Sequence, residues 1–514
     1  MSSEILINKA LRETRVARLE NGQLVEIHIE RTRDRGLVGN IYKGRVTRVL
    51  PGMQAAFIEI GLSRTAFLYV TNILDPDRKE ADAEEEEFEE PSENSAAAEE
   101  DDDPAPTTPA KNVSELIREG EMVMVQVIKE PMGTKGARLT GYISLPGRYL
   151  VYLPDTRHIG VSRRIENGEE RSRLKQIIEK NRPAQGGFIV RTVAEGASEK
   201  NLKDDMEYLV KLWGSVKKSA QKQNDPGLVY ADLDLASKII RDRVTEDVDR
   251  IVVDDMPTFK QMTKFIQAFL PRFKKRIELH TEKIPLFEHQ GLETEISRAI
   301  ARKVWLKSGG YIIIDETEAL TSIDVNTGRF VGRRNLEDTI LQTNLEALRE
   351  IAYQIRLRNL GGIIVLDFID MTKSQHRDRI YQSLLEELRK DPVRTNVLPI
   401  SELGLIEMTR KRTQESLAQR LTSSCQYCDG RGYVKSRETI AYQILRDCEK
   451  ESHQASHSAG KALVLYCHPK IAELFAEEER SCVEDFEKKI DRHLSIKIDP
   501  NLHLEEYEIF ARDA

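Results

Sequence analysis

Three short apolar runs, each meeting an aspartate, constrain the fold of this chain most strongly. They cover residues 311–315, 320–326 and 363–370, and each is rich in β-branched side chains and bounded by glycine or polar residues, as buried strands are. Between the second and third runs, residues 335–360 carry apolar side chains at helical spacing, and two glycines end the pattern. The order strand, helix, strand favours two parallel strands that end at one sheet edge.

Two of the aspartates, Asp324 and Asp367, would then lie side by side. A carboxylate at the mouth of a buried strand is costly unless something pairs with it. Mg²⁺ binds one or two carboxylates together with water and substrate phosphate oxygens. Turn formation or helix capping would explain a single aspartate, but this pair, with Asn326 and Asp370 nearby, favours a metal site. Asp315 leads into a polar turn and is not a candidate.

Several segments resemble the catalytic core of the ribonuclease E/G family, most closely its short members, which lack a long disordered tail. They are Asp-Val-Asn-Thr-Gly at 324–328, Asn-Leu-Glu-Ala at 344–347, Arg-Leu-Arg-Asn-Leu-Gly-Gly at 356–362, Val-Leu-Asp-Phe-Ile-Asp-Met at 365–371 and Ile-Glu-Met-Thr-Arg-Lys-Arg at 406–412. The resemblance implies that Asp324 and Asp367 hold a catalytic Mg²⁺ and that Asn326 hydrogen-bonds at the same site. Arg394 and the basic run at 410–412 are expected to provide further cations near RNA; a solvated basic face is the alternative.

The resemblance runs nearly end to end and implies a multidomain α/β (α+β) fold. We expect a ribonuclease-H-like part at 1–35, an S1 domain (an OB-type β-barrel) at 36–140 with a disordered acidic insertion at 75–110, a 5′-sensor at 141–236, a second ribonuclease-H-like part at 237–300, a DNase I-like catalytic domain at 301–421, a zinc link at 422–433 and a small α/β oligomerisation domain at 434–514. The residue pattern predicts a strand at 274–280 and, in the last domain, one acidic helix at 470–494.

The net charge of −8 argues at face value against a nucleic-acid-binding protein. However, residues 75–103 hold sixteen acidic and two basic residues, so the remainder of the chain carries a net charge of +6. This acidic segment is almost free of large apolar side chains, which predicts disorder. We interpret it as a solubilising loop; competition with RNA for basic surface is the alternative.

Short strands at 40–49, 54–60, 65–70 and 122–128 are typical of an OB-type barrel. Cations at 43, 45, 48 and 64 alternate with aromatic residues at 57, 67 and 69, a combination that can hold single-stranded RNA. Alternatively, the phenylalanines form the barrel core. The resemblance implies RNA contacts for Phe57, Phe67 and Lys135.

A guanidinium and a hydroxyl, Arg191 and Thr192, end an apolar run at 186–192 and suit a terminal phosphate. Taken alone this is a weak signal, because an exposed arginine at a strand end is ordinary. The resemblance implies that Arg191 and Thr192 bind a substrate 5′-monophosphate, with backbone groups of Gly147 and Val151 completing the pocket.

A Cys-x-x-Cys knuckle, Cys425 and Cys428, supplies two thiolates, whereas Zn²⁺ takes four ligands. A distant residue or a second copy of the chain must complete the site. The resemblance implies that two protomers share one zinc, in a homodimer or homotetramer. Gln426 stands where the family has proline, which leaves open whether the zinc affinity is reduced. The other cysteines have no such spacing and are expected to be structural.

The sequence shows no signal peptide and no apolar run long enough for a membrane span, so we expect a cytoplasmic location. The preferred hypothesis is an Mg²⁺-dependent, single-strand-specific endoribonuclease that favours 5′-monophosphorylated AU-rich RNA and acts in rRNA 5′-end maturation and mRNA turnover. A non-catalytic S1-type RNA-binding scaffold and a deoxyribonuclease are the alternatives. The sequence leaves the RNA targets and the choice between dimer and tetramer open.

Overall fold

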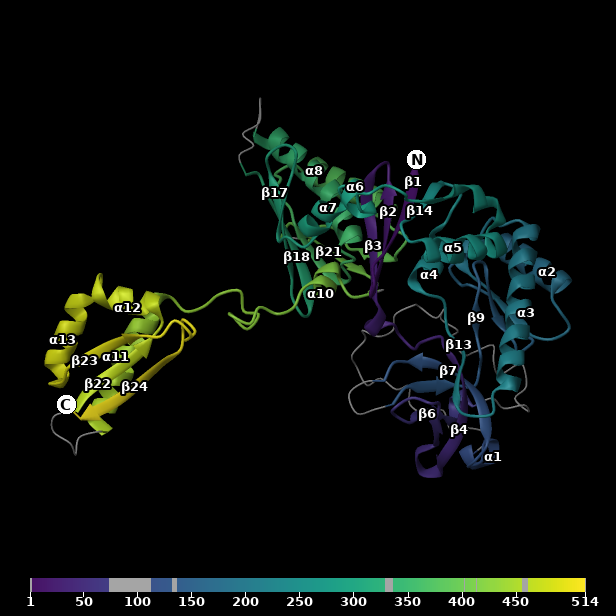
Figure 1. The fold of residues 1–514 in the computed structure, drawn as a ribbon. Coiled ribbons are helices and arrows are strands. Elements are labelled where there is room, and N and C mark those ends of the chain that lie inside the picture. Colours follow the sequence, from purple (N-terminus) through teal and green to yellow (C-terminus); the bar gives the residue numbers. More distant parts are fainter. Residues whose placement is uncertain are drawn as a thin grey trace. The chain divides into compact units, whose positions relative to one another are not determined.

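The computed structural model describes residues 2–73, 112–131, 136–328, 336–401, 403–412, 414–454 and 461–513. The predicted insertion at 75–110 and Lys135 lie outside these described residues. The chain divides into two compact units, residues 1–420 and 421–514 (Figure 1). Both units combine sheets with helices, which confirms the mixed α/β prediction, while the names and boundaries of the subdomains stay predictions.

Strands that lie far apart in the sequence share the first sheet. Its order is β15 (Ile277–Leu279), β14 (Val248–Val253), β1 (Ser3–Lys9), β2 (Glu13–Glu20) and β3 (Gln23–Arg31), with helices α4 (Leu235–Arg243) and α5 (Met256–Phe269) packed on its core. β1 pairs with β14 in parallel and with β2 in antiparallel orientation. The strand predicted at 274–280 begins only at Ile277, because Pro271 starts a 3-10 helix that runs to Arg276.

The second sheet closes into a barrel. It contains β4 (Ile41–Leu50), β5 (Ala55–Glu59), β6 (Ala66–Tyr69), β8 (Arg138–Thr140) and β7 (Met122–Lys129), with β13 (Gly227–Tyr230) added beside β4 and the short helix α1 (Val113–Leu116) contributing to the core. The pairing of β4 with β7 completes the ring of five strands. A five-stranded barrel fits the predicted S1-type architecture.

A smaller sheet follows in the order β11 (Ile159–Val161), β12 (Gly187–Val190), β10 (Leu150–Leu153) and β9 (Leu145–Pro146). Helices α2 (Gly168–Asn181) and α3 (Glu199–Lys222) pack against it through one apolar core. Ser198 caps α3 and Asp234 caps α4, each by accepting a hydrogen bond from a backbone N–H group of the first turn, as N-cap residues do.

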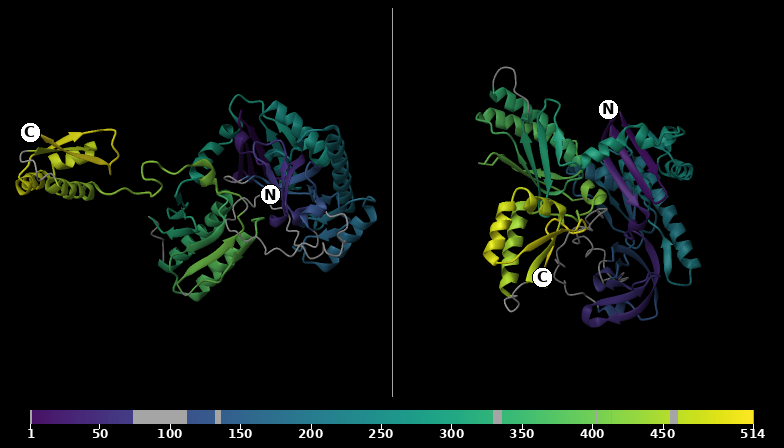
Figure 2. Two further views of the ribbon diagram at one scale, coloured as in Figure 1. Left: turned by 90° about the horizontal axis from the view of Figure 1, so that it is seen from below. Right: turned by 60° about the vertical axis from the view of Figure 1, so that its left-hand side comes forward.

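The sheet that carries the predicted metal site has six strands. Their order is β16 (Lys303–Trp305), β17 (Tyr311–Glu316), β18 (Leu320–Asn326), β19 (Gly362–Asp367), β21 (Leu405–Arg410) and β20 (Thr395–Val397). Helices α8 (Leu336–Leu357) and α9 (Ser374–Leu388) bury one face of this sheet (Figure 2). The short helices α6 (Leu286–His289) and α7 (Leu292–Ala299) precede it, and α10 (Leu417–Leu421) follows.

The second unit is a three-stranded sheet, β23 (Leu494–Ile498), β22 (Lys461–Cys467) and β24 (Tyr507–Asp513), packed with α11 (Arg437–Gln454), α12 (Pro469–Ala476) and α13 (Arg480–Ile490). The single helix predicted from Lys470 to Leu494 is wrong. Two helices form instead, because buried apolar positions stop at Phe475 and resume at Val483, with an acidic run between them. Among the described residues, no helix is long and apolar enough to span a membrane.

Candidate active site

The strand register places Asp324 and Asp367 next to each other. β18 and β19 run in parallel, and Asp324 is the direct partner of Asp367. On both strands these exposed residues alternate with buried ones, so they lie on the face of the sheet opposite the helix-covered core. The structure therefore brings together the two aspartates that the sequence predicts as a pair. That they hold a metal stays a prediction.

The charge of this pair has no basic partner among the described residues. Partial burial raises the pKa of Asp367, and the charges of Asp324 and Asp370 raise it further, while no cation within the described ranges acts in the opposite direction. Asn326 donates from Nδ2 to Asp324 Oδ2 at 2.7 Å and so orients that carboxylate. Adjacent like charges of this kind are stabilised when a cation binds between them.

The donor set fits Mg²⁺ rather than a fully protein-enclosed metal. In the part of the chain that the structure describes, no group of three or more His, Cys, Asp and Glu side chains could hold a metal ion. Mg²⁺ commonly takes only one or two carboxylates and fills its remaining positions with water and substrate oxygens. Two exposed carboxylates are sufficient for that mode of binding.

Asn344 positions the loop after β19 and has no assigned role in the sequence prediction. It is fully buried on α8, donates from Nδ2 to the Ile369 carbonyl at 2.8 Å and accepts from the Ile369 N–H at 3.2 Å. A paired hydrogen bond of this kind fixes the backbone between Asp367 and Asp370. The signal that could have identified it is a polar side chain on the apolar face of the predicted helix.

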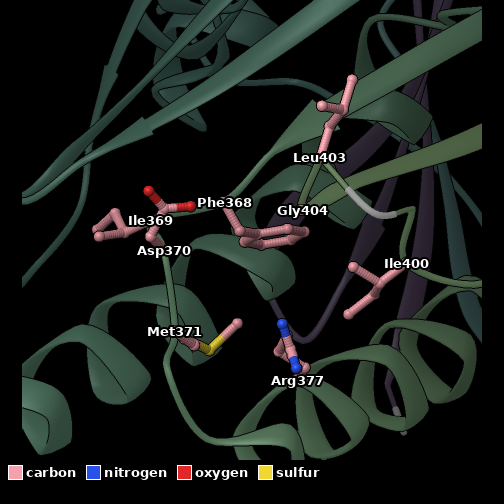
Figure 3. A pocket seen from close by; sticks show the side chains of 8 residues that line it. All are labelled: Phe368, Ile369, Asp370, Met371, Arg377, Ile400, Leu403 and Gly404. Carbon is pink, nitrogen blue, oxygen red and sulfur yellow. The ribbon is translucent and has the colours of Figure 1, made fainter.

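A cavity of about 120 Å³ lies beside this loop. Residues 368–371 after β19 line it together with Arg377 of α9 and the loop before β21 (Figure 3). Asp370 contributes to the cavity wall and also acts electrostatically on Asp367. The cavity therefore adjoins the carboxylate pair.

One predicted cation near this site is wrong. Arg410, expected to offer positive charge to RNA, is only 3% exposed. Its Nε donates to Asp391 Oδ2 at 2.7 Å, and its Nη1 donates to the Leu360 carbonyl at 2.8 Å. A buried, fully bonded guanidinium stabilises the sheet and is not available to a phosphate.

The barrel places Phe57 and Phe67 on the outer face of its strands β5 and β6. Phe57 pairs with Phe67 across β5 and β6, Arg48 pairs with Phe57, and Arg138 pairs with Phe67. The interior is filled instead by Ala56, Ile58, Ala66 and Leu68. The Phe67 ring also meets Tyr69 edge to face at 5.4 Å, and the Arg138 guanidinium lies 4.7 Å from the centre of the Tyr69 ring. The alternative that both phenylalanines form the core is therefore wrong.

Lys43 differs from the prediction that it lines an RNA surface. Its Nζ donates to the carbonyls of Ala220 and Gln223, at 3.0 and 2.6 Å. These carbonyls belong to the C-terminal end of α3, where the helix dipole favours a cation. Lys43 thus joins the barrel to α3.

Arg191 and Gly147, two of the predicted 5′-phosphate residues, are in direct contact. Arg191 Nη1 donates to the Gly147 carbonyl at 2.6 Å and to Asp242 Oδ1 at 2.9 Å. Thr192 Oγ1 lies 2.9 Å from Ser162 Oγ. Val151 is buried on β10, which pairs with β12 directly before Arg191. The predicted residues thus gather on adjoining strands, and their phosphate binding stays a prediction.

Asp205 of α3 holds the Gly147 loop and was not identified from the sequence. Its buried carboxylate accepts from the N–H groups of Arg148, Tyr149 and Leu150 at 3.2, 2.8 and 3.0 Å. Burial raises the pKa of Asp205 to about 6, against the opposing effect of these donors and of Arg191. A Cβ atom at Gly147 would lie 2.7 Å from the Asp205 carboxylate oxygens, which explains why glycine occupies that position.

The Cys425–Cys428 segment forms a tight turn in the second unit. The N–H of Gly430 donates to the Cys425 carbonyl at 3.1 Å, and the N–H of Gly432 lies 3.3 Å from Cys428 Sγ. N–H groups of Cys428 and Tyr427 lower the pKa of the Cys425 thiol. These donors favour a thiolate, the form that binds zinc. By contrast, burial raises the pKa values of Cys448 and Cys467 to about 12 and about 11, which agrees with structural thiols.

Comparison with known proteins gives two family matches. The model of the "Ribonuclease E/G family" matches residues 144–413, and that of the "RNase E/G, Thioredoxin-like domain" matches residues 424–512.

Among curated proteins, the chain is 45% identical over 509 residues to Ribonuclease G of Escherichia coli K12, which covers 99% of each chain. It is 44% identical over 507 residues to Ribonuclease G of Haemophilus influenzae, covering 98% of this chain and 99% of that protein. Against Ribonuclease E of Escherichia coli K12 the identity is 37% over 491 residues, covering 95% of this chain but 44% of the longer protein. The predicted resemblance to the short family members is confirmed.

Proposed function

Because the chain belongs to the ribonuclease E/G family it is an endoribonuclease, and we propose that it cuts single-stranded RNA with an Mg²⁺ ion held by Asp324 and Asp367. The observation that supports this most directly is the pairing of the two aspartates on an open sheet face, where no basic group in the described part of the chain acts on Asp367. The family's named ribonucleases decide against the non-catalytic scaffold and the deoxyribonuclease.

The chain's own residues would position the ion and the scissile phosphate. When bound, Mg²⁺ would lower the pKa of a water ligand and offset the charge that develops on the phosphate. Asp324, oriented by Asn326, and Asp367 supply the carboxylate oxygens. Asn344 keeps the loop after Asp367 in place. The products would carry 5′-phosphate and 3′-hydroxyl ends.

We further propose two RNA contacts outside this sheet. The outward rings of Phe57 and Phe67 would stack on bases of the substrate, and Lys135 would meet its phosphates. Aromatic side chains next to cations are suited to this combination. Arg191 and Thr192, with backbone groups of Gly147 and Val151, would bind a 5′-monophosphate. The preformed contact between Arg191 and the Gly147 loop supports that assignment.

The proposal extends to assembly and biological role. Cys425 and Cys428 would supply half of a zinc site completed by a second protomer, in a homodimer or homotetramer. The subdomain names and boundaries given above are part of this proposal. AU-rich rRNA precursors and mRNAs would be the substrates, in rRNA 5′-end maturation and mRNA turnover in the cytoplasm.

The test is a cleavage assay on matched RNA oligonucleotides with a 5′-monophosphate or a 5′-hydroxyl. We expect Mg²⁺-dependent cleavage that EDTA abolishes, faster on the phosphorylated RNA, and no cleavage of a DNA oligonucleotide of the same sequence. Equal rates on both RNAs would contradict the 5′-phosphate pocket. Cleavage that persists in EDTA would contradict the metal site.

A further inference from the structure

The six-stranded sheet that holds Asp324 and Asp367 also carries a tryptophan on its open face, and the proposed mechanism does not use this residue. Trp305, on the edge strand β16, is 62% exposed. It pairs with Tyr311 on β17, and Tyr311 pairs with Asn326 on β18. Directly paired residues share a face of a sheet, so Trp305 and Tyr311 lie on the same face as Asp324.

Lys303 completes this aromatic cluster. Its Nζ lies 4.0 Å from the centre of the Trp305 ring and 3.5 Å from that of Tyr311, while the two rings meet edge to face at 5.4 Å. Val304, the residue between Lys303 and Trp305, packs against the buried core on the other face. The strand thus contributes to the core through Val304 and leaves Lys303 and Trp305 to solvent.

The register also gives the separation from the carboxylate pair. Trp305 lies two strands away from Asp324 and one row of side chains along the sheet. With strands about 4.8 Å apart and rows about 7 Å apart, the separation is roughly 12 Å. A single strand of RNA whose phosphate lies at Asp324 reaches that distance within a few nucleotides.

We propose that Trp305 and Tyr311, held by Lys303, form a stacking platform for a nucleobase of the substrate near the scissile phosphate. The inference depends on the proposed function, because it assumes that RNA passes the Asp324–Asp367 pair. An exposed ring next to a cation binds any base through its π face. The platform therefore contributes affinity with little dependence on sequence.

Fluorescence tests the platform directly, because the chain has two tryptophans. Trp213 is 5% exposed and serves as the internal reference. A single-stranded RNA added without Mg²⁺ should quench the emission of the wild type and of Trp213→Phe but leave Trp305→Phe unchanged. An oligomer of abasic nucleotides should quench none of them. Quenching that persists in Trp305→Phe would overturn the proposal.

A binding and cleavage series gives the second readout. Trp305→Ala should bind RNA on the order of tenfold more weakly, whereas Trp305→Phe retains a ring and should stay within about threefold of the wild type. Phe510→Ala, at a residue 51% exposed in the second unit, is the matched control and should not change binding. Normal binding and cleavage by Trp305→Ala would overturn the platform alone. A wild type whose tryptophan emission is quenched by RNA but that shows no Mg²⁺-dependent cleavage would overturn the nuclease site alone.

Discussion

The Asp324–Asp367 pair of the six-stranded sheet and the carboxylates next to the Gly147 loop, Asp205 and Asp242, differ in how their charge is balanced. Asp324 and Asp367 lie exposed and adjacent, and the groups that act on Asp367 are other carboxylates. Asp205 and Asp242 are buried or nearly so, and backbone N–H groups, Arg191 and Arg241 satisfy them. The adjacent carboxylates of Asp324 and Asp367 suit the binding of an external cation. Asp205 and Asp242 use their charges to hold a loop in one conformation.

The largest expected effect is on cleavage. Asp324→Asn should slow cleavage about 1,000-fold, equivalent to about 4 kcal/mol of transition-state stabilisation, because one of the two proposed metal ligands loses its charge. RNA binding and protein stability should be unchanged, which gel-shift and denaturation measurements would verify.

Asp315→Asn is the matched control, since Asp315 lies on the same sheet but pairs with Arg302 through two hydrogen bonds. It should retain activity within about twofold of the wild type, in line with a surface ion pair. Equal losses of activity in Asp324→Asn and Asp315→Asn would contradict the distinction between the two carboxylates.

The next effect is on stability and depends on pH. Burial raises the pKa of Asp205 from 3.8 to about 6. Between pH 3.8 and about pH 6, the Asp205 carboxyl is therefore protonated in the folded state and ionised in the unfolded state. Stability from this group is therefore present below pH 4 and lost as the pH rises towards 6, by about 3 kcal/mol at most. Asp205→Asn should remove this pH dependence of the free energy of unfolding, measured by denaturation at several pH values from 4 to 7.

Asp204 provides the control for that measurement, because it is the exposed neighbour of Asp205 on α3. Asp204→Asn should keep the wild-type pH dependence. If Asp205→Asn kept it as well, another group would be responsible and the role of burial at Asp205 would be refuted.

A smaller effect should follow from loosening the loop after β19. Asn344→Ala removes both hydrogen bonds to Ile369, worth about 2 kcal/mol together. We expect kcat to fall roughly tenfold while KM changes little, because the change displaces the backbone between Asp367 and Asp370. Thr343→Val is the control, since Thr343 is equally buried and bonds to Thr339 within its own helix. Steady-state kinetics that show a change only in KM would argue against a positioning role.

An effect of similar size, confined to one class of RNA, concerns substrate choice. Arg191→Gln should reduce the preference for 5′-monophosphate over 5′-hydroxyl RNA about tenfold, the value of one charge-assisted hydrogen bond. Cleavage of the 5′-hydroxyl RNA should be unaffected, because Asp242 keeps Arg241 as its partner. A similar loss on both RNAs would mean that Arg191 serves structure alone.

The same two regions show what the sequence could predict. The Asp324–Asp367 pair could be predicted from the sequence, because strand periodicity and the single intervening helix determine which residues become neighbours. The role of Asp205 could not be predicted, because its partners are backbone N–H groups of a loop far away in the sequence, and such partners leave no pattern of side chains. Lys43 and Arg410 were misassigned for the related reason that a cation's partner, a helix end or a buried carboxylate, is set by tertiary packing.

The central claim is tested most directly by the Mg²⁺ dependence of cleavage of a 5′-monophosphorylated RNA under single-turnover conditions. The wild type and Asp315→Asn should follow one saturation curve, and Asp367→Asn should need more Mg²⁺ and reach a far lower maximal rate. If Asp367→Asn follows the wild-type curve, the paired carboxylates do not hold the catalytic ion.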